Sequence, residues 1–212
     1  IETFSEYAGK IDILQINGDL VDAQAISRFN KVYRKSPMEE ILIARQYMID
    51  LIEMLQPKKV VVNYGNHDLR FQNYLAKNLD TDLLELMPKT SLELIFVDGF
   101  NHYNKELHTK VHYDPLIDVF KDSGIEIVYN DTWFSFVGET IFVHPLAYSS
   151  GMLKTAEKAY RYFKDNDYFF DTIVMAHTHK TGHYDIGNSV IYEQGCCCET
   201  SKMDYADGKL TP

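Results

Sequence analysis

The chain has 212 residues, of which 45% are hydrophobic and 25% are charged, a composition typical of a folded globular protein rather than a disordered one. Its formal net charge of −10 at pH 7 disfavours nonspecific binding to nucleic acid, because an acidic surface repels phosphates at long range. The sequence has no apolar run of transmembrane length and no signal-peptide pattern at its first residues. No internal repeat or linker divides the sequence, so we expect a single domain over residues 1–212. We expect its location to be the cytoplasm.

Strands alternate with helices in the first half of the chain. The apolar patterns predict the end of a helix, a strand, a helix and a second strand, over residues 1–9, 11–16, 37–56 and 58–63. Gly9 suits a helix C-terminus, Pro37 suits the first position of the long helix, and Ser36 with Glu39 predicts a capping box. Strand, helix and strand in this order are the unit of a sheet covered by helices.

Short strands and hairpin turns dominate the second half. Short helices are expected over residues 68–78, 80–87 and 115–122, and a longer one over 152–164. Strands are expected over residues 125–129, 133–137, 140–143, 172–176, 182–186 and 189–193. We interpret residues 69–124 as a candidate substrate-specificity insert, whose irregular part carries the half-exposed aromatic residues His102, Tyr103, His108, His112 and Tyr113. The order of elements predicts two sheets between helices.

Four segments rich in metal-ligand residues follow apolar, β-branched runs. They are Gly18-Asp19-Leu20-Val21-Asp22, Gly65-Asn66-His67-Asp68, His144 and His177-Thr178-His179. Each alone has a plain alternative as a turn or as an ordinary strand end. Together they indicate metal ligands gathered at one edge of a sheet. On a strand, the two histidines of the last segment would point to one face.

With these segments the chain resembles the calcineurin-like metallophosphoesterase superfamily, whose pattern is D-x-H, G-D-x-x-D, G-N-H-[DE], a lone His and G-H-x-H. The resemblance implies an α/β (α+β) fold, a four-layer αββα sandwich of two mixed β-sheets flanked by helices. It implies hydrolysis of phosphodiester or phosphomonoester bonds by a hydroxide activated between two divalent metal ions. The segments are more similar to the phosphodiesterase and repair-exonuclease branches than to protein phosphatases.

The resemblance also implies a set of metal ligands. Asp19 would bridge the two ions, Asn66, His144 and His177 would complete one site, and His179 would bind the other ion. Amide oxygen and imidazole nitrogen suit Mn²⁺ best, with Fe²⁺, Zn²⁺ or Ni²⁺ as alternatives. The substrate would be a phosphate ester, with nucleotides and nucleic acids included.

The resemblance further implies residues that act on the substrate. His67 would be the general acid, and Asp22 would fix its tautomer. Protein phosphatases of the superfamily carry an arginine directly after G-D-x-x-D, where this chain has Ala23. Arg28 and Arg70 are the candidate substitutes for binding phosphate, and a structural role is the alternative for each.

The D-x-H block of the pattern is absent, and Ala176 replaces the usual glycine of the last block. Three interpretations follow: a block upstream of Ile1, a protein with a single metal, or a degenerate relative that acts as a binding module. The non-Met start and the incomplete first helix favour the first.

Two further features bear on function. A nuclease acting on DNA ends or single strands is an alternative function. For it, a row of basic residues would bind successive phosphates, although a solvated helix face is the simpler interpretation; these residues are Lys154, Lys158, Arg161 and Lys164.

The only three cysteines, Cys196 to Cys198, are contiguous, which is a poor framework for disulfides and indicates a reducing compartment. We expect them to pack as small strand residues, with metal binding as the alternative.

Overall fold

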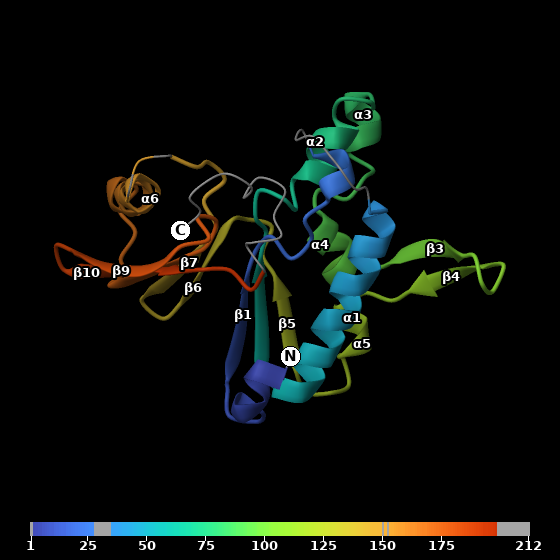
Figure 1. Cartoon of the computed structure of the whole chain (residues 1–212), viewed down its shortest axis with the longest axis horizontal. Helices are drawn as coiled ribbons and strands as arrows, with labels where there is room; N and C mark the ends of the chain where they lie inside the picture. Colours follow the sequence, from blue (N-terminus) through green and yellow to red (C-terminus); the bar gives the residue numbers. More distant parts are fainter. Residues whose placement is uncertain (1, 28–34, 150, 152, 199–212) are drawn as a thin grey trace.

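Two β-sheets lie between helices in the computed structural model, which describes residues 2–27, 35–149, 151 and 153–198 (Figure 1). The first sheet has the order β1-β2-β5, with strands Ile13–Asn17, Lys59–Asn63 and Glu126–Tyr129. The second sheet has the order β6-β7-β8-β10-β9, with strands Phe134–Val137, Thr140–Val143, Thr172–Met175, Ser189–Gln194 and Thr181–Ile186.

The two sheets differ in strand direction. In the first, β1 pairs with β2 and β2 with β5, both parallel, so the prediction that both sheets are mixed was wrong for the described strands of this one. Long helical connections return the chain to the same end of the sheet before each new strand, as parallel pairing requires. The second sheet is mixed: β6-β7 and β10-β9 are antiparallel, whereas β7-β8 and β8-β10 are parallel.

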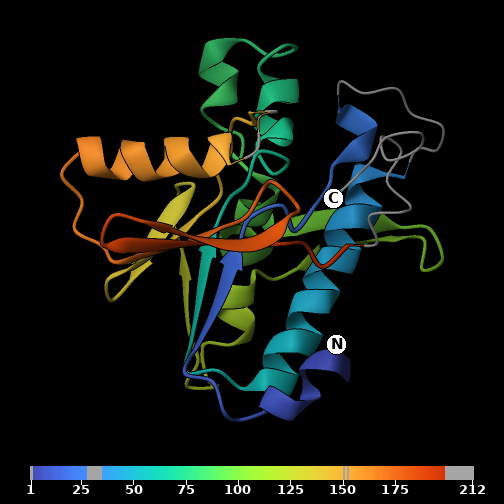
Figure 2. The ribbon, with the colours of Figure 1, turned by 60° about the vertical axis from the view of Figure 1, so that its left-hand side comes forward.

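Helices cover the outer face of each sheet, and others lie beyond the ends of the strands (Figure 2). The α-helices are α1 (Pro37–Leu55), α2 (Arg70–Leu75), α3 (Thr81–Leu84), α4 (Ser91–Glu93), α5 (Leu116–Val119) and α6 (Lys154–Asp165). Two 3₁₀ helices, η1 and η2, and one π-helix, η3, span Glu2–Tyr7, Gln24–Ile26 and Leu94–Asp98. None of the helices in the described ranges is long and apolar enough to cross a membrane.

Each sheet has its own apolar core. Met48 and Ile52 of α1 are fully buried in one cluster with Val60 and Val62 of β2. On the other sheet, α6 contributes alanines and Phe163 to a second cluster with residues of β7, β8 and β10. Because side chains alternate along a strand, each sheet packs one face against its own helix and turns the other toward the second sheet. The result is four layers: α1, the first sheet, the second sheet and α6.

Buried polar side chains bridge the two sheets. Asn17 is buried and donates hydrogen bonds to the main-chain oxygens of Val143 (3.0 Å) and Val174 (3.3 Å). Asn63, also buried, donates to the oxygen of Phe142 at 3.1 Å. Because these side chains bind main-chain atoms of the facing strands, they fix how the two sheets are placed relative to each other.

Three local predictions need correction. Ser36 stands at the N-cap of α1 but makes no side-chain capping bond, so the capping box does not form; Pro37 begins the helix as predicted. The helix predicted to end at Gly9 is a 3₁₀ helix that ends at Tyr7, and Gly9 lies in the turn after it. The predicted irregular chain at 100–113 is an antiparallel hairpin of β3 (Phe100–Asn104) and β4 (Thr109–Tyr113), which projects to one side in Figure 1.

Candidate metal centre

The candidate site lies where strands of both sheets end. Strands β1 and β2 are parallel neighbours and end side by side, below α2 and α3 in Figure 2. Strands β7 and β8 are parallel neighbours in the second sheet. The predicted ligand segments follow these four strands, so the topology places all of them at adjoining sheet edges.

Two glycines allow the loops after β1 and β2 to approach each other. Gly18 has φ 76°, and a Cβ there would lie 2.5 Å from the backbone nitrogen of Gly65. A Cβ at Gly65 would meet the carboxylate of Asp19 and would lie 2.8 Å from the ring carbon Cε1 of His144. Any larger residue at either position would separate the two loops.

Asp68 joins the same two loops. Its side chain is fully buried, and its Oδ2 accepts hydrogen bonds from the backbone N–H groups of Asp19 and Gly65, both at 2.8 Å. The hydroxyl of Ser91 donates to Oδ1 at 3.2 Å. Burial and the charge of Asp19 raise the pKa of Asp68, the backbone hydrogen bonds oppose both effects, and the net result is a pKa of about 7.

Three electron-rich atoms converge at His144. The buried ring lies with Nδ1 2.8 Å from the main-chain oxygen of Asn17, so Nδ1 carries the proton that it donates there. The other ring nitrogen, Nε2, lies 3.1 Å from Oδ1 of Asn66 and 3.2 Å from Oδ2 of Asp19. Because the proton on Nδ1 is already donated to Asn17, Nε2 can meet the oxygens of Asn66 and Asp19 only with its lone pair. These lone pairs would repel one another unless a proton or a metal cation lies between them.

His177 adds a fourth donor group. Its Nδ1 lies 2.8 Å from Oδ1 of Asn66, and its Nε2 is buried without a hydrogen-bond partner among the described residues. Asp19, His144 and His177 each offer one ligand atom, and these atoms all lie within 4.8 Å of one another. A carboxylate, an amide oxygen and two imidazoles gathered in this way, one of them with an orphaned buried nitrogen, fit a divalent cation of the Mn²⁺ to Zn²⁺ class.

The ionisation of Asp19 and His177 suits metal binding, whereas His144 holds a proton that it must lose first. Burial raises the pKa of Asp19, but the hydrogen bond and charge of His144 outweigh it and hold this pKa well below its usual range. Burial lowers the pKa of His144, but Asp19 outweighs it, and the net shift is upward. The pKa of His177 falls to about 4, first through burial and then through the charge of His144. His177 is therefore a neutral ligand at physiological pH.

His67 stands beside this centre and is held from two sides. Its backbone N–H donates to Oδ1 of Asp19 at 2.8 Å. Its ring Nδ1 lies 2.9 Å from Oδ1 of Asp22, which leaves Nε2 toward the site, 3.9 Å from Oδ2 of Asp19. Arg70 donates to both the main-chain oxygen (2.6 Å) and Oδ1 (2.7 Å) of Asp22. The hydrogen bond from His67, against the effect of burial, lowers the pKa of Asp22.

A protein-family model described as calcineurin-like phosphoesterase matches residues 2–181 of the chain. The chain belongs to this family. The match spans all four ligand segments and confirms the resemblance that they carried, and with it the general chemistry of a metal-dependent phosphoesterase. No curated protein and no solved structure matches the chain.

The structure brings most of the predicted site residues together. One local prediction needs correction. His177 and His179 are not on a strand: β8 ends at Met175, and both histidines have left-handed backbones, with φ 82° and 60°. Burial lowers the pKa of His179 and the nearby carboxylate of Asp19 opposes this effect, so the two residues lie within electrostatic reach.

The two predicted phosphate-binding arginines have different outcomes. Arg28 lies outside the described residues. Arg70 is bound to Asp22, and through it to His67, so the structure gives it a contact with the catalytic candidates rather than an open guanidinium. A direct contact between Arg70 and substrate stays a prediction.

Two other sequence expectations have opposite outcomes. On α6, Glu157 forms ion pairs with Lys154 (2.9 Å) and Arg161 (2.7 Å) at an exposed surface, which is the solvated face that the simpler interpretation expected. The three cysteines do not pack inside a strand: β10 ends at Gln194, and Cys196, Cys197 and Cys198 are all exposed and free. The role of Asp68 was missed, because the sequence does not show which aspartate will be buried between loops.

Proposed function

We propose that this protein hydrolyses phosphate esters, with a preference for phosphodiesters, using two divalent cations of which Mn²⁺ is the first expectation. The observation that carries the proposal is the group of Asp19, His144 and His177, whose ligand atoms all lie within 4.8 Å of one another. Nε2 of His177 is also buried without a partner among the described residues. Bound cations would neutralise charge on the phosphoryl oxygens and lower the pKa of a water molecule.

The residues around this centre divide the remaining work. Asp19 keeps Oδ1 on the backbone of His67 and presents Oδ2 to the centre. Asp22 holds Nδ1–H of His67, so that Nε2 is the atom that gives a proton to the leaving oxygen. The carboxylate of Asp22 also stabilises the charged imidazolium before that transfer. Arg70, through its two bonds to Asp22, fixes the position of this pair.

The substrate preference rests on what the segments contain. Ala23 stands where protein phosphatases of the family carry a phosphate-binding arginine, which supports diester over monoester chemistry. The net charge of −10 disfavours a polyanionic nucleic acid, so the nuclease alternative is the weaker one. Free cysteines support a cytoplasmic location.

Parallel assays test the proposal. The metal-free protein is supplied with Mn²⁺ and given an aryl phosphomonoester, an aryl phosphodiester and single-stranded DNA, with Asp19→Asn as the control that lacks the bridging carboxylate. We expect fastest turnover of the diester and none in the control. Faster monoester turnover would overturn the diester preference, and rapid DNA cleavage would establish the nuclease. Metal binding without any turnover would identify a binding module instead.

A further inference from the structure

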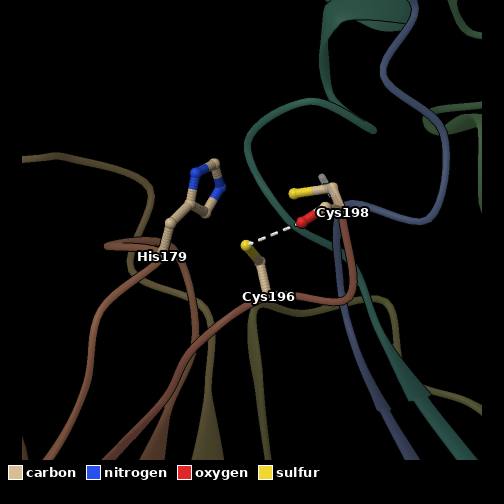
Figure 3. Close-up of side chains that lie close together, drawn as sticks. All are labelled: His179, Cys196 and Cys198. Carbon is tan, nitrogen blue, oxygen red and sulfur yellow. Dashed lines mark hydrogen bonds between the residues drawn. The ribbon is translucent and has the colours of Figure 1, made fainter. Parts of the chain in front are cut away.

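A second group of metal-ligand side chains lies outside the predicted site. His179, Cys196 and Cys198 each offer one ligand atom, and the three atoms lie within 4.8 Å of one another. Figure 3 shows the imidazole ring and both sulfur atoms turned toward the same space. Of these three residues, only His179 belongs to the ligand segments that the chain shares with the family pattern. The two thiols are therefore ligands beyond that pattern.

The topology explains why residues so far apart in sequence meet here. His179 lies in the loop after β8, and the cysteines lie in the loop after β10. Strands β8 and β10 are parallel neighbours, with Met175 opposite Glu193, so both loops leave the sheet at the same edge. Such an edge collects side chains from separate loops without any need for them to be close in sequence.

The backbone on both sides is shaped for this approach. Gly195 has φ 75°, and a Cβ there would lie 2.7 Å from the side-chain methyl of Thr181. The turn at Gly195 therefore requires glycine and brings the cysteine loop over the start of β9. The two thiols that face His179 are separated by one residue, whose own thiol is not part of the group.

We propose that His179, Cys196 and Cys198 bind a thiophilic divalent cation, Zn²⁺, with the remaining coordination position open. Two thiolates and one imidazole select zinc over manganese, because sulfur is a soft ligand. Three protein ligands with an open fourth position are also the arrangement of zinc sites that carry out chemistry rather than hold a fold. The exposed thiols are accessible to a cation from solvent.

This inference rests on the proposed function in one respect: it supplies additional ligands for the cation expected at His179. It gives that centre two unlike halves. Around Asp19, His144 and His177 the donors are oxygen and nitrogen, whereas around His179 two of three donors are sulfur. The first half suits Mn²⁺ and the second suits Zn²⁺.

Cobalt titration of the whole chain tests the zinc site. Thiolate ligands give Co²⁺ an intense near-ultraviolet charge-transfer band that oxygen and nitrogen ligands do not give. With a phosphine reductant present, we expect this band in the wild type and its loss on addition of Zn²⁺. Cys196→Ser and Cys198→Ser should each weaken the band strongly. Cys197→Ser is the matched control, since it removes the neighbouring thiol that lies outside the group, and it should keep the band.

The outcomes separate this inference from the proposed function. If the wild type lacks the band, or if all three serine variants lose it equally, the zinc site is overturned. Neither result bears on the proposed function, because Mn²⁺-dependent turnover is measured separately. A band that follows Cys196 and Cys198 in a protein without turnover supports the zinc site and overturns the hydrolase. In Asp19→Asn the band should persist, because it reports the two thiolates and this substitution leaves both in place.

Discussion

Replacing Asp68 by alanine and by asparagine separates the hydrogen bonds of this buried carboxylate from its charge. Its Oδ2 accepts two backbone N–H groups, from Asp19 and Gly65, and its Oδ1 accepts the hydroxyl of Ser91. In Asp68→Asn, the amide oxygen can take the place of Oδ2, and the amide NH₂ can donate to the Ser91 hydroxyl oxygen. In Asp68→Ala, both backbone N–H groups lose their acceptor.

The magnitude follows from those two donors. A buried donor left without an acceptor costs about 1–3 kcal/mol, so Asp68→Ala should lower the free energy of unfolding by roughly 2–6 kcal/mol. For a chain of this size each kcal/mol corresponds to about 2–4 °C in Tm. Asp68→Asn should stay within about 1 kcal/mol of the wild type, because every hydrogen bond has a replacement.

The assay is thermal unfolding of the metal-free proteins, followed by circular dichroism at several pH values. The pKa of Asp68 is about 7 in the folded state, above its usual 3.8, so the folded chain binds more protons than the unfolded chain between these values. Wild-type stability should therefore fall as the pH rises through this range, relative to Asp68→Asn. Equal losses in the two variants, or no loss in Asp68→Ala, would refute the reasoning.

Three other predictions concern the site and the sheets. His67→Ala should lower kcat by about 10²–10⁴-fold with Mn²⁺ content unchanged, because only the general acid is removed; unchanged turnover would exclude His67 from that role. Since His144 has a raised pKa and must lose its proton to bind a cation, Mn²⁺ affinity should rise with pH below that pKa, by at most tenfold per unit, and level off above it. Titrations that give the same affinity at every pH would contradict this. Asn17→Ala should lower the free energy of unfolding in urea by about 1–3 kcal/mol, because it removes the donors to Val143 and Val174; Asn101→Ala, on the exposed hairpin, is the control that should not.

Much of the fold could be predicted because apolar periodicity marks buried strands and helices directly. Residues 37–56 and 58–63 were predicted as a helix and a strand, and the structure has Pro37–Leu55 and Lys59–Asn63. The hairpin at 100–113 escaped because one face of its strands is exposed, the other is mostly only partly buried, and the residues show no apolar alternation.

The site was partly predictable for a related reason. Ligand residues that follow strands can be located in the sequence, and parallel pairing then brings their loops to one edge. The burial of Asp68 and the thiols facing His179 depend on which loops meet in three dimensions. Neither local propensity nor residue spacing encodes that meeting, so these features became visible only in the fold.

The backbone at the candidate ligands has a consequence for how such a chain can change. Asp19, His177 and His179 all have left-handed φ values, of 55°, 82° and 60°, a conformation that costs a residue with a side chain about 1 kcal/mol or more. Glycine would relieve that strain at each position. This chain has a carboxylate and two imidazoles at these positions. Glycine at any one of them would remove a candidate ligand without adding backbone strain, so a glycine variant separates loss of metal binding from loss of folding.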